Sequence, residues 1–230
     1  MDRYNIINGK NEREIVLLKS FPCVWGKCSF CDYISDNSED KCEVRSVNKP
    51  ILAQITGEKG VLEVINSGSV FEIPKEDLAE IKRIVKEKNI KKLYFEAHWC
   101  YRKRLGEMKD LFEGVQVLFK TGIETFDDEF RNDILIKNVK YKSIDEVKEY
   151  YDSICLMVGI KGQTKEMIRR DIEIVETQFE RATINIWTEN TTKFKRDEEL
   201  IKWFEKEYSY LRENEKIEVL FENTDFGVGD

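Results

Sequence analysis

Segments typical of β-strands alternate with segments typical of helices, and this alternation limits the fold more than any other feature of the sequence. It is the pattern of parallel strands joined by crossover helices. We expect strands at about 14–20, 60–65, 92–96, 116–120, 153–158, 182–187 and 217–221. We expect helices at about 74–88, after Ser143, at about 165–178 and at about 196–213.

Six strand-helix units and a closing strand predict an α/β fold, a partial (β/α)6 barrel that is open on one side. The 230 residues suit a single domain with a core at about 13–190. A short C-terminal extension of helix, strand and tail is expected at about 191–230. Ligands bind such sheets at the carboxyl ends of the strands. The functional residues should therefore lie in the loops that follow the strands.

Charge and hydropathy argue against two kinds of partner. The chain has 38 basic and 45 acidic residues and a net charge of -7, which disfavours a nucleic acid held through its phosphates. No apolar run approaches the roughly 18 residues of a membrane-spanning helix, and the N-terminal segment does not resemble a signal peptide. We therefore expect a cytoplasmic protein with no membrane partner. In that compartment we interpret the six cysteines as thiols or metal ligands in preference to disulfides.

Three cysteines follow the first predicted strand closely. Cys23, Cys28 and Cys31 form a C-x4-C-x2-C pattern, so their thiolates can converge on one inorganic centre. A 2Fe-2S centre shares this spacing but needs a fourth cysteine in register. A structural zinc site also needs four ligands, usually as two close pairs. Neither alternative accounts for the rest of the chain.

A strand that leads into three clustered cysteines, with the aromatic Phe30 just before the third, resembles the radical S-adenosyl-L-methionine (SAM) superfamily. The resemblance implies a 4Fe-4S cluster on Cys23, Cys28 and Cys31, with one open iron that chelates SAM. It also implies one-electron cleavage of SAM and hydrogen abstraction from a substrate. The first gap of the motif is four residues here, whereas three is usual in the superfamily.

Two downstream motifs strengthen the resemblance. The turn of Ser67, Gly68 and Ser69 resembles the small turn whose backbone receives the SAM ammonium, although a plain turn after a strand would look the same. Residues 122–125 resemble the G-[IL]-E-[ST] element of the tRNA methylthiotransferase and Elongator branches. The resemblance implies that Glu124 helps to orient SAM through charge-assisted hydrogen bonds.

A third motif follows the fifth predicted strand. Residues 159–164, with Gly159 and Lys161, resemble the region that flanks the adenine of SAM, its final acid being shifted here to Glu166. A loop that caps the next helix is the alternative. Asn185 is a candidate partner of SAM or substrate, and Glu96 is a candidate SAM ligand or a surface ion pair.

Other candidate residues lie outside the three motifs. Lys120 interrupts an apolar strand, and a charge in such a place must face a polar group. We expect Lys120 and Glu124 to act at the reaction centre, with a buried structural ion pair as the alternative for Lys120. His98 is expected to have a packing or surface role. The remaining cysteines, which are Cys42, Cys100 and Cys155, are interpreted as buried thiols.

The segment 21–34, together with the tail at 222–229, resembles the queuine lyases of bacterial queuosine salvage. The resemblance implies cleavage of queuine to release 7-aminomethyl-7-deazaguanine, with flavodoxin or ferredoxin as electron donor. The alternatives are a radical SAM reaction on another small molecule or on tRNA, and a non-catalytic iron-sulfur or zinc module. Carboxylates and amides would bind the edges of the 7-deazapurine base, and aromatic rings would stack on it. The candidates are Trp25, Asn185, Trp187, Glu222, Asn223, Asp225 and Phe226.

Overall fold

The computed structural model describes residues 3–221 of the chain. These residues fall into two compact units. Unit 1 consists of residues 3–26 and 33–120, and unit 2 of residues 27–32 and 121–221. In both units the order of the strands follows the chain. The single domain expected from the sequence, with its core at about 13–190, stays a prediction.

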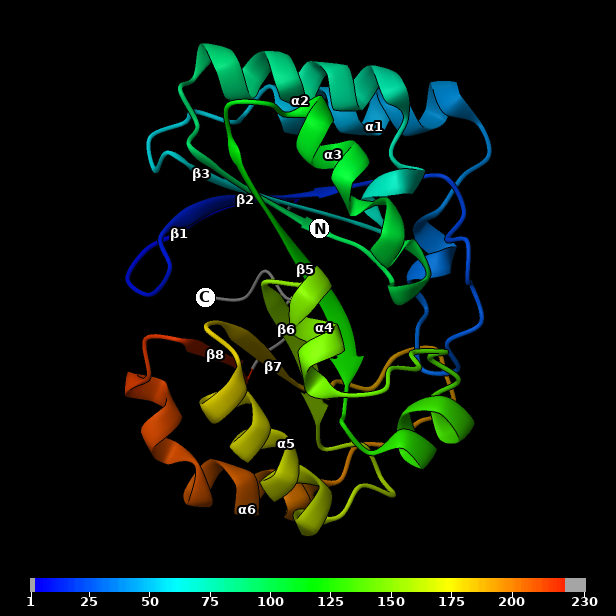
Figure 1. Cartoon of the computed structure of the whole chain (residues 1–230). Helices are drawn as coiled ribbons and strands as arrows, with labels where there is room; N and C mark the ends of the chain where they lie inside the picture. Colours follow the sequence, from blue (N-terminus) through cyan, green and yellow to red (C-terminus); the bar gives the residue numbers. More distant parts are fainter. Residues whose placement is uncertain (1–2, 222–230) are drawn as a thin grey trace. The chain divides into compact units, whose positions relative to one another are not determined.

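Unit 1 is a mainly parallel sheet with helices along it. Its elements are β1 Tyr4–Ile7, β2 Arg13–Leu18, α1 Lys41–Leu52, β3 Val61–Asn66, α2 Lys75–Glu87, β4 Lys92–Glu96, α3 Leu105–Leu111 and the first part of β5 Gln116–Glu124. Strands β2 to β5 are parallel, and β1 pairs antiparallel with β2. Helices α1 and α2 lie side by side on one face of these strands (Figure 1).

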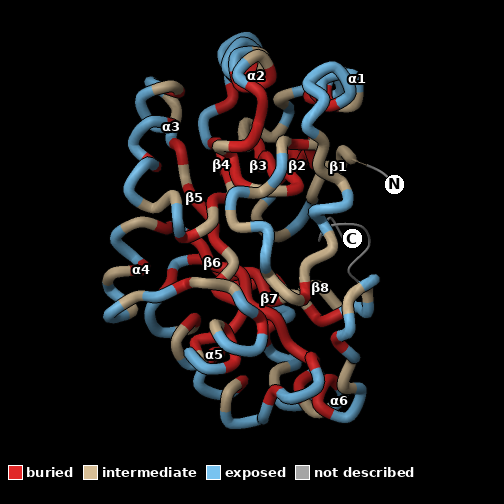
Figure 2. The backbone as a smooth tube through the Cα atoms, turned by 90° about the vertical axis from the view of Figure 1, so that its right-hand side faces the viewer, coloured by how far each residue is buried: buried red, intermediate tan, exposed pale blue. Residues whose placement is uncertain are grey.

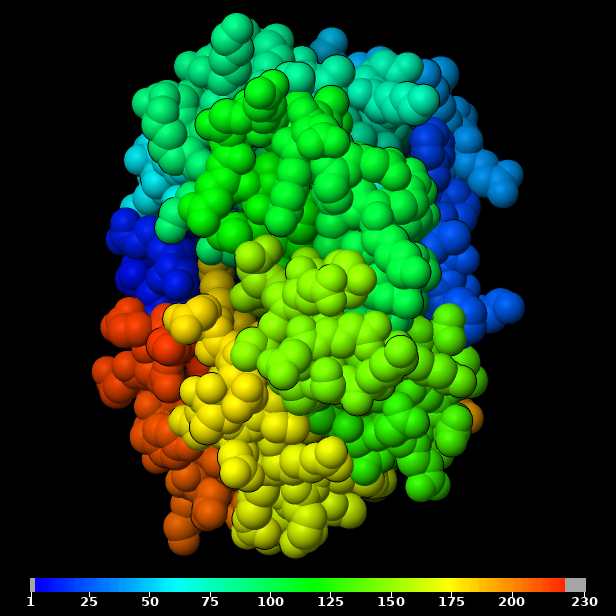
Figure 3. Space-filling view, viewed as in Figure 1, coloured from blue at the N-terminus to red at the C-terminus, as the bar shows by residue number. Residues whose placement is uncertain are grey.

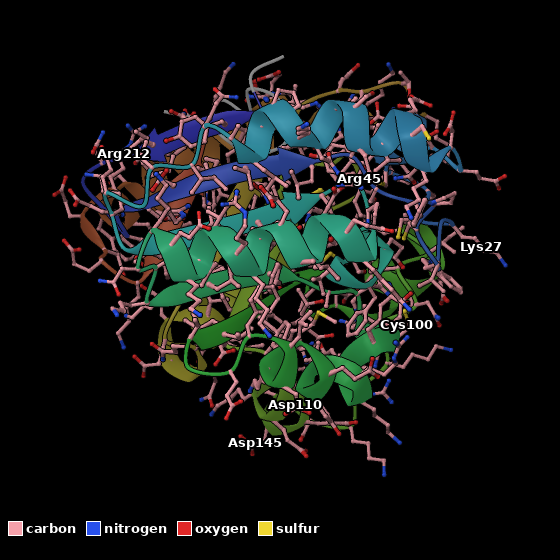
Figure 4. The ribbon with its side chains drawn as sticks, turned by 90° about the horizontal axis from the view of Figure 1, so that it is seen from above. Lys27, Arg45, Cys100, Asp110, Asp145 and Arg212 are labelled. Carbon is pink, nitrogen blue, oxygen red and sulfur yellow. The ribbon has the colours of Figure 1, made fainter. Side chains whose placement is uncertain are left out.

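Ion pairing and packing hold the helices of unit 1 in place. Arg45 of α1 lies beside α2, where its Nε is 3.2 Å from Oδ1 of the buried Asp77 (Figure 4). Side chains of α2 and α3 form a closed surface over the unit on the side that Figure 3 faces. Beneath them the ring of Phe95 packs against Phe112, with centroids 5.3 Å apart.

The other face of the sheet in unit 1 carries polar side chains. Successive residues of a strand point to opposite faces, so Tyr94 and Glu96 point away from the helix side on which Phe95 packs. Glu63 is the register partner of Tyr94, and Lys120 is that of Glu96. The carboxyl ends of these strands therefore bring several polar groups to one side of the sheet.

Unit 2 begins with the segment 27–32 and the end of β5. Its further elements are α4 Ile144–Tyr150, β6 Ser153–Val158, α5 Lys165–Gln178, β7 Ala182–Ile186, α6 Glu198–Glu207 and β8 Ile217–Leu220. Strands β6, β7 and β8 are parallel. Figure 2 shows that burial is concentrated on the strands, whereas the helices are exposed along their outer sides. No helix within residues 3–221 is both long and apolar enough to cross a membrane.

The structure differs from the expected elements in four places. Strand β5 continues through Glu124, so the motif at 122–125 lies mostly within a strand and not after it. The helix expected at 196–213 is the shorter α6, followed by a 3-10 turn at Ser209–Glu213. Strand β1 and helix α1 were not predicted. In α1 the internal Pro50 and the low apolar content obscured the helical pattern, although Asp40 caps its first turn.

Candidate functional site

The cysteine motif is divided between the two units, so each part is described with the unit that carries it. In unit 1, Cys23 follows β2 and is half-buried. Its backbone N–H donates to Asn37 Oδ1 at 3.3 Å, and the N–H of Val24 donates to Glu72 Oε1 at 3.2 Å. Gly26 has φ +55, and a Cβ there would lie 3.1 Å from the carbonyl oxygen of Cys23. The loop is therefore held by backbone contacts on both sides of the thiol.

The predicted SAM turn follows β3 in the same unit. Asn37 Nδ2 donates to the carbonyl oxygen and the Oγ of Ser67, at 2.7 and 2.8 Å. Ser69 and Glu72 form a capping box at the start of the next turn. A Cβ at Gly68 would lie 3.1 Å from Glu72 Oε2, so a larger residue there would crowd this carboxylate. The turn and the Cys23 loop therefore share Asn37 and Glu72 as anchors.

Glu72 is a residue that the sequence interpretation missed. Burial raises the pKa of its carboxyl, although hydrogen bonds from Tyr101, Ser69 and Val24 act in the opposite direction. The Tyr101 hydroxyl donates to Glu72 Oε1 at 2.7 Å. The sequence S-x-x-E at 69–72 is the readable signal that could have identified this cap.

Trp25, His98 and Cys100 form a small cluster in unit 1. The rings of Trp25 and His98 stack with centroids 6.3 Å apart. His98 Nδ1 lies 3.2 Å from Cys100 Sγ. Although Cys100 is exposed as a residue, partial burial of its thiol, followed by the negative charge of Glu72, raises the pKa of that thiol to about 11. The packing role expected for His98 agrees with this stack.

The interpretation of all three remaining cysteines as buried thiols was wrong for two of them. Cys42 and Cys100 are exposed, whereas Cys155 is buried. Cys42 lies in the first turn of α1, a helix that the sequence interpretation did not include. Cys100 lies in the 3-10 turn Trp99–Arg104, where the neighbouring Trp99 takes the buried position.

Lys120 lies in a buried ion-pair network of unit 1. Its ammonium pairs with the carboxylate of Glu63, which also pairs with the guanidinium of Arg13. All three side chains are at most 7% exposed. This is the structural pair that the sequence left open as the alternative, so a direct role of Lys120 toward SAM or substrate stays a prediction. Glu96 is half-buried at the end of β4, and its role also stays a prediction.

Unit 2 carries Cys28 and Cys31. The backbone N–H and the hydroxyl of Ser29 donate to the carbonyl oxygens of Leu135 and Ile134, at 3.0 and 2.7 Å. The Asn190 amide donates to the carbonyl oxygen of Phe30 at 2.8 Å. Both cysteines pack against the buried cluster that contains Phe30 and Leu135. The short segment is therefore clamped from two sides.

Glu124 has a partner that the sequence interpretation missed. Its Oε1 lies 2.6 Å from Nζ of Lys137, and the two side chains are 7% and 13% exposed. The ammonium also lies 5.4 Å from the centroid of the Phe30 ring. A Cβ at Gly122 would lie 2.3 Å from Glu124 Oε1 and 2.8 Å from Lys137 Nζ, so only glycine leaves room for this pair.

The surroundings of Lys137 stabilise its protonated, positively charged form. Burial alone would lower the pKa of its ammonium, but the negative charges of Glu124, Cys28 and Cys31 together raise that pKa above its ordinary value. Lys137 therefore stays protonated over the physiological range.

The loop after β6 is closed by a side chain. Gln163 Oε1 accepts hydrogen bonds from the N–H groups of Gly159 and Ile160, at 2.8 and 3.0 Å, and its Nε2 donates to the carbonyl oxygen of Met157 at 2.8 Å. Lys161 is exposed in this loop. Glu166, expected as the final acid of the motif, lies in the exposed first turn of α5 and pairs with Arg169 at 3.4 Å.

Trp187 follows β7 and is 6% exposed. Its ring meets Phe30 edge to face, with centroids 6.4 Å apart. Within residues 3–221 its buried indole Nε1 has no hydrogen-bond partner. Asn185 is half-buried on the preceding strand. The other expected substrate residues, Glu222, Asn223, Asp225 and Phe226, lie outside the described residues.

Soft thiolate donors are the usual ligands of iron-sulfur clusters. Cys28 and Cys31 fit such a group because they are partly exposed and have a cation, Lys137, nearby. Within residues 3–221 no three cysteine, histidine, aspartate or glutamate side chains are grouped to hold a single metal ion. Cys23, Cys28 and Cys31 as cluster ligands, and the other assigned site residues, stay predictions.

Solved structures provide the comparison. A queuine lyase from Clostridium spiroforme, bound to SAM and queuine, is 56% identical over 100% of both chains, with a TM-score of 0.96. A radical SAM methyltransferase from Sphaerobacter thermophilus is 17% identical over 90% of this chain and 65% of its own, with a TM-score of 0.58. Streptococcus suis SuiB is 16% identical over 91% of this chain and 49% of its own, with a TM-score of 0.56. These last two matches concern the fold alone.

No family model and no curated protein matches the chain. The fold and the cysteine segment nevertheless define a radical SAM enzyme, and the expected α/β partial barrel is confirmed by the full-length match. At 56% identity over its whole length, the chain belongs to the queuine lyase family.

Proposed function

We propose that this protein is a radical SAM lyase that cleaves queuine and releases 7-aminomethyl-7-deazaguanine in queuosine precursor salvage. The observation that carries the proposal is the full-length match, at 56% identity, to a queuine lyase bound to SAM and queuine. When bound, a 4Fe-4S cluster and SAM would supply one-electron cleavage of SAM and hydrogen-atom abstraction from the substrate.

The side chains supply binding and orientation. Cys23, Cys28 and Cys31 hold the cluster. The turn of residues 67–69 offers backbone groups to the SAM ammonium, and Glu72 fixes that turn to the loop of Cys23 through the Val24 N–H. Phe30 fixes the spacing between Cys28 and Cys31 because its ring is buried in the core of unit 2.

Two carboxylates and one loop complete the proposed SAM site. Glu124 and Glu96 orient the amino and ribose groups. The loop with Gly159 and Lys161 flanks the adenine. Gln163 stabilises its conformation with two hydrogen bonds inside the loop, from Gly159 and Ile160, and one to Met157 at the end of β6.

Aromatic and amide groups bind the base. Trp25 and Trp187 offer ring faces or edges, a stacking contact being worth about 1–3 kcal/mol per base. The Trp187 indole, which lacks a partner within residues 3–221, donates to an acceptor of the bound molecule. Asn185 binds a further polar edge. Lys120 acts at the reaction centre through its ion pair with Glu63, which holds the ammonium in place.

The proposal places the reaction in the cytoplasm, where cysteine thiols stay reduced. The substrate is a small 7-deazapurine, and neither a nucleic acid nor a membrane takes part. A reduced flavodoxin or ferredoxin supplies the electron.

The test is anaerobic reconstitution with iron and sulfide, followed by incubation with dithionite, SAM and queuine. Mass spectrometry should detect 7-aminomethyl-7-deazaguanine and 5'-deoxyadenosine. Cys28→Ala should lose both products and most of the iron. The exposed Cys42→Ala is the matched control and should retain both products.

Three other outcomes would change the assignment. Formation of 5'-deoxyadenosine without release of the base would indicate a different radical SAM substrate. Turnover of tRNA in place of free queuine would move the substrate to a nucleic acid. Stable binding of zinc without either product would indicate a non-catalytic module.

A further inference from the structure

Lys137 is not part of the cysteine motif, but its side chain reaches the segment that carries Cys28 and Cys31. Its ammonium is nearly buried, pairs with Glu124 at 2.6 Å, and lies 5.4 Å from the centroid of the Phe30 ring. Phe30 is the residue between Ser29 and Cys31, so the ammonium is brought to the cysteine segment itself. Cys28 and Cys31 pack against the buried cluster to which this Phe30 ring belongs.

The backbone around this ion pair is in a conformation that side chains rarely adopt. Ile136 and Asn138 have φ values of 52 and 55, and Glu124 has φ 66. A branched residue such as Ile136 is a genuine outlier at positive φ. One partner of the ion pair, Glu124, and both chain neighbours of the other, Lys137, thus have positive φ, which indicates that the pair is held in place against a local cost, a feature typical of functional sites.

A π-helical turn at Phe130–Ile134 sets the direction of the segment that carries Lys137. Arg131 of this turn is fully buried and donates to the carbonyl oxygens of Thr125 and Val139, each at 2.9 Å, and to the Tyr141 hydroxyl at 3.0 Å. Arg131 therefore fixes the end of β5, after Glu124, to the chain just beyond Lys137.

The same segment is fastened to the cysteines. The two hydrogen bonds from Ser29 to the carbonyl oxygens of Ile134 and Leu135 join the residue after Cys28 to the residues just before Lys137. The position of the ammonium relative to Cys28 and Cys31 is therefore set by short backbone links and not by a long flexible loop.

We propose that Lys137 is a positioning residue that compensates the negative charge of the Cys28 and Cys31 thiolates and thereby raises the reduction potential of the cluster they hold. The inference rests on the proposed function, because it requires that cluster. Glu124 sets the strength of the effect, since its carboxylate neutralises part of the lysine charge.

The physical reason is electrostatic. Reduction transfers one electron from the donor to the cluster and makes its total charge more negative by one unit, without making or breaking a bond. A nearby ammonium stabilises the reduced form more than the oxidised form. Water screens the interaction incompletely because the Lys137 side chain is only 13% exposed, although Cys28 and Cys31 are partly exposed. Loss of the ammonium should therefore lower the potential, and loss of the Glu124 carboxylate should raise it.

The test is a redox titration of reconstituted protein without SAM, followed by electron paramagnetic resonance of the reduced cluster. Lys137→Met should change the reduction equilibrium at least tenfold against the reduced form, a fall of about 59 mV for one electron. Glu124→Gln should shift the potential upward, and Lys137→Arg should restore most of the wild-type value. The matched control is Lys140→Met, an exposed lysine three residues away, which should leave the potential unchanged.

Unchanged potentials in both Lys137→Met and Glu124→Gln, or shifts of both in the same direction, would overturn the inference. If Lys137→Met fails to retain a cluster, Glu124→Gln decides alone, and a fall or no change there would overturn the inference. A wild-type protein that forms no reducible cluster would instead overturn the proposed function. A reducible wild-type cluster with unaltered potentials in the variants would leave that function standing.

Discussion

The Tyr101 hydroxyl donates a 2.7 Å hydrogen bond to Glu72 Oε1, the same oxygen that receives the N–H of Val24, the residue after Cys23. Burial, and next the Glu72 carboxylate, raise the pKa of Tyr101, so the phenol stays protonated and keeps donating. One buried carboxylate thus ties the 3-10 turn after β4 to the loop of the first cysteine.

Glu72→Ala should destabilise the protein and weaken the hold on Cys23. Three donors would lose their acceptor. The Ser69 N–H is buried, and leaving a buried donor unsatisfied costs about 1–3 kcal/mol, whereas the partly buried Val24 N–H and Tyr101 hydroxyl cost less. Urea unfolding should show the loss of stability, and the iron retained after reconstitution should fall. Glu76→Ala is the control, because that side chain is 42% exposed and its carboxylate pairs with the exposed Lys41, so both measurements should stay near wild type. Wild-type stability in Glu72→Ala would contradict the role given to this residue.

Trp187→Phe should separate ligand binding from folding. Phenylalanine keeps an aromatic ring against Phe30 but removes an indole N–H that has no partner within residues 3–221. The free energy of unfolding should fall, because the smaller ring leaves a cavity at a position that is 6% exposed, so the effect on the ligand is measured on protein shown to be folded. The KM for queuine should rise about three- to tenfold, which corresponds to one hydrogen bond. Trp203→Phe, whose ring lies 5.2 Å from Lys165 Nζ, should leave that KM unchanged.

Asp171 should make stability depend on pH near neutrality. Burial raises the pKa of its carboxyl to about 7, from the roughly 3.9 of an unperturbed aspartate, although Thr125 and the N–H of Phe126 donate to it. The folded protein therefore binds more protons at this group than the unfolded chain between those two values, so stability falls as pH rises through that window. The slope for one proton is at most about 1.4 kcal/mol per pH unit. Unfolding of Asp171→Asn between pH 4 and 8 should show a flatter profile, and an unaltered slope would refute the assignment.

Gly159→Ala should destabilise unit 2. Gly159 has φ +98, and a Cβ there would lie 2.4 Å from Ile201 Cγ1. The left-handed backbone costs about 1–2 kcal/mol and overpacking a further 1–3 kcal/mol. Thermal unfolding should show the loss. Gly106→Ala is the matched control, because its Cβ meets nothing within 4 Å in α3, and it should be neutral or stabilise by about 0.5–1 kcal/mol.

Elements with strong local signals could be predicted from the sequence. Strands β4 and β6 and helix α5 have the expected bounds. Thr164 caps α5 by accepting the N–H of Met167 at 3.2 Å, and such a cap is readable in the sequence. By contrast, the π-helical turn and the left-handed Ile136 and Asn138 have no sequence signature, because tertiary contacts impose them.

The sequence predicted the site residues that belong to local motifs. It missed the interaction partners that are distant along the chain. Glu124 was identified, but its ion pair with Lys137 depends on a turn that propensity does not encode. Lys120 was identified as a charge that needs a partner, but Glu63 lies 57 positions away along the chain and only the strand register brings the two together. Gly122 is the local sequence signal of the Glu124–Lys137 ion pair, because its missing side chain leaves space for the two charged groups.

The antiparallel pairing of β1 with β2 has a consequence for solution behaviour. Every residue of β2 is buried. If its backbone amide and carbonyl groups were unpaired, β2 would be an edge strand able to pair with another chain. Tyr4–Ile7 occupies those groups with only four residues of its own. A strand so short offers little template for recruiting another polypeptide, and the N-terminal segment thereby protects the enzyme from sticking to copies of itself.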